Sequence, residues 1–189
     1  IGHHGDIAHM GMGWDNTGPK HVEGIRWDPV TERNNLYNSP ARYMFNLKYK
    51  GGTNLTVANA SDMPDIWPSK GELGTMFIGS RGRWLWVDRG GLKASDDKIL
   101  DIKMGKRDFT FREGRNHMTD WLNCIVSREE TIAPVNAGHR SASIGHLGKI
   151  ACTLGSSFKW DPKKEEIKDN EALNGMLTRK YRGDWSLEA

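Results

Sequence analysis

The strongest alternation of apolar and polar positions lies in the segment ARYMFNLKYK and predicts a β-strand. Large side chains occupy every second position there, at Tyr43, Phe45, Leu47 and Tyr49. A period of two places these side chains on one face of a half-buried strand. Gly51 and Gly52 follow as a two-residue turn, so residues 53–59 are predicted to return beside the first strand as a hairpin.

A second hairpin is predicted in the segment TMFIGSRGRWLWVDRGG, with Ser-Arg-Gly as its turn. In its second strand Trp84 and Trp86 share one face, and Leu85 and Val87 share the other. The segments HVEGIRW and KILDIKM are weaker strand predictions.

Helical spacing replaces this alternation at both ends of the chain. Residues 3–14 place apolar side chains on one helical face. Residues 115–127 and 137–155 show the same three- and four-residue spacing, with Pro134 between them and Gly155 as a helix end.

The order of these elements predicts an α+β fold. A helix, antiparallel strands and further helices indicate an open, mostly antiparallel sheet with helices packed on one face. A short helix is expected around residues 170–176. The whole chain, residues 1–189, is expected to form a single domain. The 22 glycines and 8 tryptophans suit a sheet of hairpins with a large aromatic surface.

Composition excludes some classes of partner. The net charge of +3, from 27 Lys and Arg against 24 Asp and Glu, is too small to indicate nucleic acid binding. No apolar run approaches the roughly 18 residues of a membrane span, so no membrane partner is expected. Cys124 and Cys152 are interpreted as two buried thiols, with a disulfide or metal pair as the alternative.

The first residues, IGHHGDIAHM, carry the densest chemistry. His3 and Asp6 are three positions apart, so a helix places them on one face, where the carboxylate can orient the imidazole as a general acid or base. With His9 they form an HxxDxxH series, which raises a metal site as an alternative. Positions six residues apart diverge by about 120° around a helix, which argues against three converging ligands. Structural histidines near a helix start remain the third interpretation.

Two further polar groups stand at predicted helix starts. His139 and Arg140, in GHRSA, would combine free backbone N–H groups with a guanidinium and favour anionic or hydroxyl-rich ligands, or else serve as a cap and a surface charge. The segment RNHMTDW is interpreted as a polar helix start. No glycine-rich phosphate loop, either GxGxxG or Walker, occurs in the chain.

Four segments resemble the Gfo/Idh/MocA oxidoreductases, in particular a bacterial branch found in planctomycetes and related phyla. They are GHHGDIAHMGMGWDNTGP, LYNSPARYMFNLKYKGGTNLTVAN, GTMFIGSRGRWLWVDRGGLKAS and WLNCIVSREETIAPVNAGHRSASIGHLGKIACTLGSSFKWDPKKEEI. They follow the family's order and cover nearly the whole chain. The resemblance is to the C-terminal domain alone, an α/β domain of the kind found in glyceraldehyde-3-phosphate dehydrogenase. The N-terminal Rossmann domain that binds NAD or NADP is expected to be absent from this chain.

The resemblance implies a reaction and a set of site residues. The reaction is hydride transfer between a secondary alcohol of a sugar or polyol and a nicotinamide. His3 matches the catalytic histidine of the family's DxGxHxxD motif, and Asp6 its last aspartate. Ile1 stands where the motif's glycine is expected, so the match is limited to His3-x-x-Asp6. His4, His139 and Arg140 are expected to contact substrate.

The resemblance therefore implies a substrate-binding and oligomerisation domain. The parent enzyme would use NAD or NADP, with no cofactor expected for this chain alone. Homo-oligomers are expected to form through the exposed face of the sheet, with the tryptophan pair or the tyrosine row as the apolar surface. The alternative is a non-catalytic carbohydrate-binding or oligomerisation module.

Overall fold

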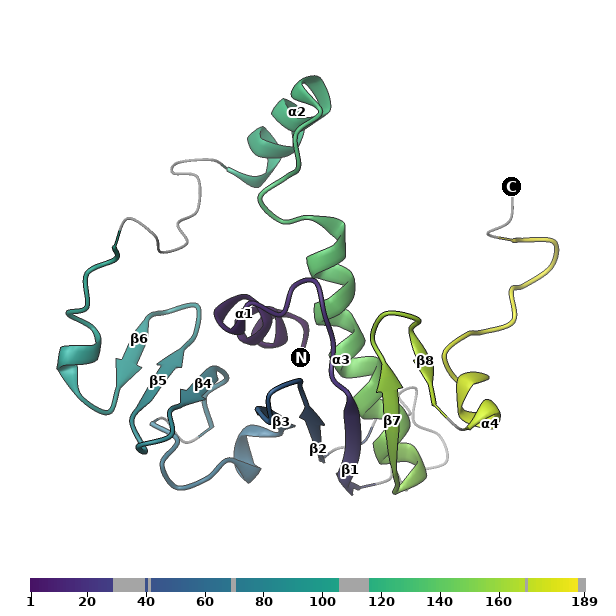
Figure 1. Ribbon diagram of the computed structural model, residues 1–189, viewed down its shortest axis with the longest axis horizontal. Coiled ribbons are helices and arrows are strands. Elements are labelled where there is room, and N and C mark those ends of the chain that lie inside the picture. The colour runs from purple at the N-terminus through teal and green to yellow at the C-terminus, as the bar shows by residue number, and fades with distance from the viewer. Residues whose placement is uncertain (29–39, 41, 69–70, 106–115, 169, 187–189) are drawn as a thin grey trace. The chain divides into compact units, whose positions relative to one another are not determined.

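The chain divides into two compact units in the computed structural model, which describes residues 1–28, 40, 42–68, 71–105, 116–168 and 170–186 (Figure 1). One unit comprises Thr17–Pro64 and Ser143–Ala189 together with Ile1. The other comprises Gly2–Asn16 and Asp65–Ala142. Each unit has its own antiparallel sheet.

The first unit is built on a five-stranded sheet in the order β3-β2-β1-β7-β8. Every strand pair in it is antiparallel. The strands are β1 (His21–Trp27), β2 (Tyr43–Lys48), β3 (Asn54–Ala58), β7 (Ser157–Asp161) and β8 (Glu166–Ile167). The predicted hairpin is confirmed, since β2 and β3 pair around Gly51 and Gly52, whose φ angles are 93° and 88°.

Helix α3 (Val135–Leu154) covers one face of this sheet, and glycines allow the close approach. A Cβ at Gly148 would lie 2.3 Å from the Phe45 ring, and one at Gly24 would lie 2.5 Å from the carbonyl oxygen of Ala151. Phe45 and Leu47 are therefore buried between β2 and the helix. The predicted period of two in β2 is confirmed, because its apolar face is the one that the helix covers.

The other face of the five-stranded sheet is polar, which corrects one expectation. The register aligns Lys48, His21 and Lys159 across three strands on the face opposite to Val22 and Leu47. The row from Tyr43 to Tyr49 lies on the helix side, where Phe45, Leu47 and Tyr49 are buried. It is therefore not the exposed apolar surface that was expected for oligomerisation.

The second unit contains helix α1 (Gly2–Met12), the three-stranded sheet β4-β5-β6 and helix α2 (His117–Ser127). The strands are β4 (Thr75–Ile78), β5 (Trp84–Val87) and β6 (Leu92–Ala94). Helix α1 packs closely on one face of this three-stranded sheet, where a Cβ at Gly11 would lie 2.6 Å from the Phe77 ring. On the other face Trp86 is 1% exposed and meets the Trp67 ring edge-on. This buried tryptophan is not an exposed interface side chain either.

Several local predictions are confirmed. Asn116 caps α2, because its side chain accepts from the Met118 N–H at 2.8 Å, and Gly155 ends α3 with a φ of 58°. Both cysteines are free and buried. The short helix is α4 (Glu171–Asn174).

The segment KILDIKM is not a strand. Its first residues belong to a 3-10 turn at Asp97–Ile99, because the Asp96 side chain caps that turn by accepting from the Lys98 N–H at 3.0 Å. Strands β7 and β8 were not predicted, although β7 pairs directly with β1. In the part of the chain that the structure describes, no helix is long and apolar enough to cross a membrane.

Candidate active site

Helix α1 presents the predicted acid–base pair on its exposed side. His3 and Asp6 are both exposed, one helical turn apart. His4 is half-buried, and His9, one turn after Asp6, is fully buried. The geometry separates His9 from the exposed pair, so the three do not converge. Among the described residues no group of His, Cys, Asp or Glu side chains could hold a metal ion.

A buried hydroxyl holds the Asp6 carboxylate. Ser141, in the second turn of α3, donates a hydrogen bond from its Oγ to Asp6 Oδ1 at 2.8 Å. Ser141 is 4% exposed, whereas Asp6 lies at the surface. Both residues belong to the same compact unit. The contact joins positions 135 residues apart in the sequence.

His9 lies beneath this contact as a neutral imidazole. Burial lowers its pKa to about 4, the nearby Asp6 carboxylate opposes that shift, and the Arg140 guanidinium adds to it. The ring meets Trp14 edge-on, with 6.0 Å between ring centroids. The His9 carbonyl oxygen accepts the Trp14 N–H at 2.8 Å. His9 therefore belongs to the core of the site and not to its reactive surface.

Its surroundings favour the neutral form of the His4 side chain, and a hydrogen bond from β4 anchors the His4 backbone. Burial lowers its pKa, and neighbouring positive charges that include Arg89 lower it further. Its carbonyl oxygen accepts a hydrogen bond from Thr75 Oγ1 at 2.7 Å. Strand β4 thus fixes the first turn of α1, and the turn that follows β5 brings the charges of Arg89 and, in opposition, Asp88 to bear on His4.

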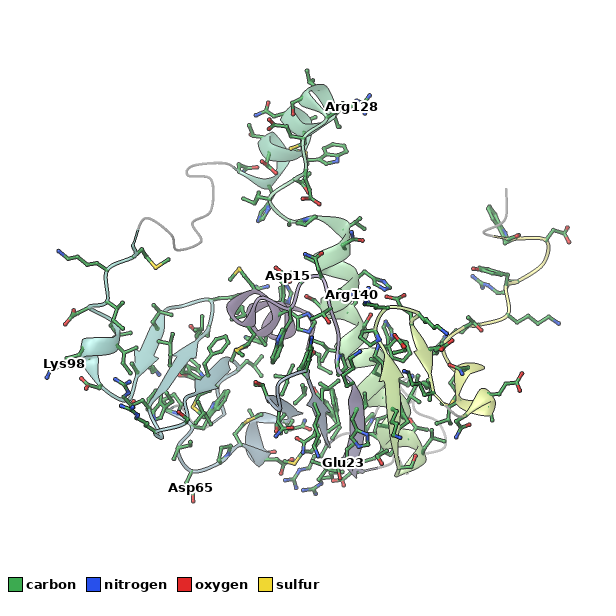
Figure 2. The ribbon with its side chains drawn as sticks, viewed as in Figure 1. Asp15, Glu23, Asp65, Lys98, Arg128 and Arg140 are labelled. Atoms are coloured by element: carbon green, nitrogen blue, oxygen red, sulfur yellow. The ribbon has the colours of Figure 1, made fainter. Side chains whose placement is uncertain are left out.

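A second carboxyl group, Asp15, follows α1. Burial raises its pKa, and the charge of Asp6 raises it further. Its Oδ1 atom is buried and has no hydrogen-bond partner among the described residues. Figure 2 shows Asp15 just after α1 and Arg140 on α3.

His139 and Arg140 do not stand at a helix start, which corrects the expectation made for the GHRSA segment. Helix α3 begins at Val135, so both residues lie in its second turn. Their backbone N–H groups are within the helical hydrogen-bonding pattern and are not available as an anion-binding terminus. Arg140 still contributes to the site through its side chain, because its charge acts on His9. His139 is exposed.

Comparisons with known proteins place part of the chain in a family. Residues 94–187 match the model of an oxidoreductase family, the C-terminal alpha/beta domain of the Gfo/Idh/MocA proteins. The matched segment is 94 of the 189 residues, just under half of the chain. No curated protein matches the chain.

A solved structure of a candidate oxidoreductase from Thermotoga maritima also matches, at 12% identity and a TM-score of 0.43. The match covers 84% of this chain and 45% of that one. The chain therefore spans less than half the length of that structure.

The Gfo/Idh/MocA segment contains α2, α3, β7 and β8, and with them His139, Arg140 and Ser141. Helix α1, with His3, His4 and Asp6, lies outside the matched residues. The two parts of the candidate site thus come from different regions of the sequence, and they meet where Ser141 binds Asp6.

Sequence reasoning missed Ser141, Asp15 and Arg89. Ser141 lies in the GHRSA segment, but a serine in a helix carries no signal of a partner 135 residues away. Asp15 follows the helix in GWDNTGP, where an acid before a turn is ordinary. Arg89 lies in a predicted turn, and only the fold brings its charge to His4.

Proposed function

We propose that this chain is the substrate-binding and oligomerisation part of an NAD(P)-dependent oxidoreductase that acts on a secondary alcohol of a sugar, polyol or derivative. The observation that carries the proposal is the exposed His3 and Asp6 pair on α1, in a chain whose other half matches a Gfo/Idh/MocA domain. His3 is the proposed catalytic residue. Asp6 is proposed to orient its imidazole.

The proposed role of His3 is proton transfer at the reacting hydroxyl. Oxidation of a secondary alcohol removes a hydride from carbon and a proton from oxygen, so the site needs a base near that oxygen. An exposed imidazole can accept this proton from the hydroxyl and return it in the reverse direction. The buried His9 cannot do so, because burial keeps it away from any substrate.

The other proposed contacts suit a neutral, hydroxyl-rich substrate. The Arg140 guanidinium and the His139 imidazole can both donate hydrogen bonds to hydroxyl oxygens. His4, half-buried beside the pair, presents a mainly neutral ring that can either donate or accept. These three residues are the proposed substrate contacts.

The described residues of this chain do not form a binding site for the nicotinamide nucleotide. Such sites use a parallel strand, a glycine-rich turn and a helix. All strand pairs of the described residues are antiparallel, so none of their strands has that arrangement. We therefore assign no residue of this chain to the nucleotide. The proposal places nucleotide binding in a part of the protein outside these 189 residues.

The second candidate function is a non-catalytic carbohydrate-binding or oligomerisation module. The same lack of a nucleotide-binding unit among the described residues favours it. It makes a different prediction for His3, which would then serve only to bind ligand or to stabilise α1.

Mutation of His3 in the full-length protein that contains this chain tests the proposal. With NAD or NADP and a panel of polyols, His3→Ala should lower kcat by roughly 10²- to 10⁴-fold, the usual contribution of a positioned acid–base group. Nucleotide affinity should hardly change. Asp6→Asn should cause a smaller loss, and His4→Ala a smaller one again. Full activity in a folded His3→Ala enzyme would contradict the assignment, and no dehydrogenase activity in the intact protein would favour the binding module.

A further inference from the structure

The buried Ser141 hydroxyl donates a hydrogen bond to the surface carboxylate of Asp6. Its hydroxyl is 4% exposed and lies 2.8 Å from Asp6 Oδ1. A hydroxyl buried at this level needs a hydrogen-bond partner, since an unsatisfied one costs free energy. Here the partner is a charged group on another helix, which makes the bond stronger than one between neutral groups.

Asp6 depends on this one bond for its orientation. The residue is exposed on α1, and among the described residues Ser141 is its only hydrogen-bond partner. An exposed carboxylate on a helix otherwise samples several side-chain rotamers. The bond uses Oδ1 of Asp6, and the exposed His3 stands one turn earlier on the same helix.

We infer that Ser141 is a positioning residue, which holds the Asp6 carboxylate in the single orientation that the acid–base pair on α1 requires. The inference rests on the proposed function for its chemical meaning. With Ser141 in this role, the second turn of α3 becomes part of the proposed active site. That turn also carries Arg140, whose charge acts on His9, one turn after Asp6 on α1.

The alternative is that Ser141 only contributes to packing between α1 and α3. The two roles differ in what a conservative substitution should do. Ser141→Ala removes the donor, whereas Ser141→Thr keeps a hydroxyl at the same carbon. Ser95→Ala is a matched control in the same unit, because it also removes one serine hydrogen bond, the one that Ser95 Oγ accepts from the Trp84 N–H at 3.0 Å.

The first measurement needs no substrate. NMR couplings between the Asp6 Hα and its two Hβ protons report the χ1 rotamer in the intact 189-residue chain. We expect one rotamer in the wild type, in Ser141→Thr and in Ser95→Ala, and averaged couplings in Ser141→Ala. Unchanged Asp6 couplings in a folded Ser141→Ala chain would overturn the inference.

The second measurement asks whether the orientation matters for the reaction. In the full-length enzyme Ser141→Ala should lower kcat by about 10- to 100-fold, the equivalent of one hydrogen bond to a charged group, with KM nearly unchanged. Ser141→Thr should restore most of kcat, and Ser95→Ala should leave it unchanged. A normal kcat in Ser141→Ala beside a strongly reduced one in His3→Ala would overturn the inference alone. A fully active His3→Ala enzyme would contradict the proposed function instead, and with it the catalytic meaning of Ser141.

Discussion

At the scale of single residues, His9 shows how burial controls charge. Its side chain is 0% exposed, and burial lowers its pKa from 6.5 to about 4, with Asp6 opposing the shift and Arg140 adding to it. The folded state therefore keeps His9 neutral at a pH where the unfolded chain binds a proton. Folding stability from this group is complete above about pH 6.5 and is lost as the pH falls toward 4. At about 1.4 kcal/mol per pKa unit, the loss is about 3 kcal/mol.

Urea unfolding at pH 7 and at pH 4.5 measures this dependence. His9→Gln should flatten the change in the free energy of unfolding between the two values, because glutamine does not titrate. His146→Gln is the matched control, since His146 is exposed on α3 and should keep the wild-type dependence. An equally steep pH dependence in His9→Gln would show that another group is responsible.

At the scale of elements, the contact between α3 and the five-stranded sheet depends on two glycines. A Cβ at Gly148 would meet the buried Phe45 ring, and a Cβ at Gly24 would meet the Ala151 backbone. Neither neighbour can move freely, because the ring is enclosed and the backbone is part of the helix. Gly148→Ala and Gly24→Ala should each lower the free energy of unfolding by about 1–3 kcal/mol, the usual cost of overpacking.

Gly138→Ala in the same helix is the control for these two variants. A Cβ there would have no neighbour within 4 Å, so only the higher helix propensity of alanine remains. This variant should raise the free energy of unfolding by up to about 1 kcal/mol. Chemical denaturation measures all three variants. Stabilisation by Gly148→Ala would show that the helix stands farther from the sheet than the structure places it.

At the scale of the whole molecule, the proposal predicts that this chain by itself does not bind NADH or NADPH. The nucleotide is assigned to a part of the protein outside the chain, and the described strands form no unit that would cradle its phosphates. Titration of NADH into the purified chain, followed by calorimetry or fluorescence, measures the affinity. Micromolar binding would contradict the prediction.

Self-association is the second prediction at this scale. Light scattering at micromolar concentration should give a mass above the 21.3 kDa of one chain. The proposed interface is the open face of the five-stranded sheet, where Glu23 lies on the same face as Lys48 and Lys159, which flank His21 on the neighbouring strands. Glu23→Lys removes the acidic group and should weaken the oligomer by repulsion between like charges.

A variant of α2 separates the sheet face from another surface. This helix exposes a set of large apolar side chains, namely Met118, Trp121, Leu122, Ile125 and Val126. Trp121→Glu should leave the mass unchanged if the sheet face is the interface. Dissociation by Trp121→Glu alone would move the interface to α2, and a clean monomer in the wild type would contradict self-association.

The sequence by itself determined the features that depend on near neighbours in the chain. The period of two in β2, the glycine turn after it and the polar start of α2 are all local, so their residues suffice to predict them. The exposed pair on α1 is local in the same way, because helical geometry alone places His3 beside Asp6. The α+β class followed from the order of such elements.

The tertiary structure decided which faces are covered and which distant residues meet. Strand β7, SFKWD, alternates polar and apolar residues over only five positions, and its pairing with β1 places it in the sheet. The apolar row of β2 became core because α3 lies on it, and the strands divided between two sheets. The burial of His9 and the bond from Ser141 to Asp6 arise when α1 and α3 are brought together across most of the chain. Such contacts follow from chain packing, and spacing in the sequence carries no signal of them.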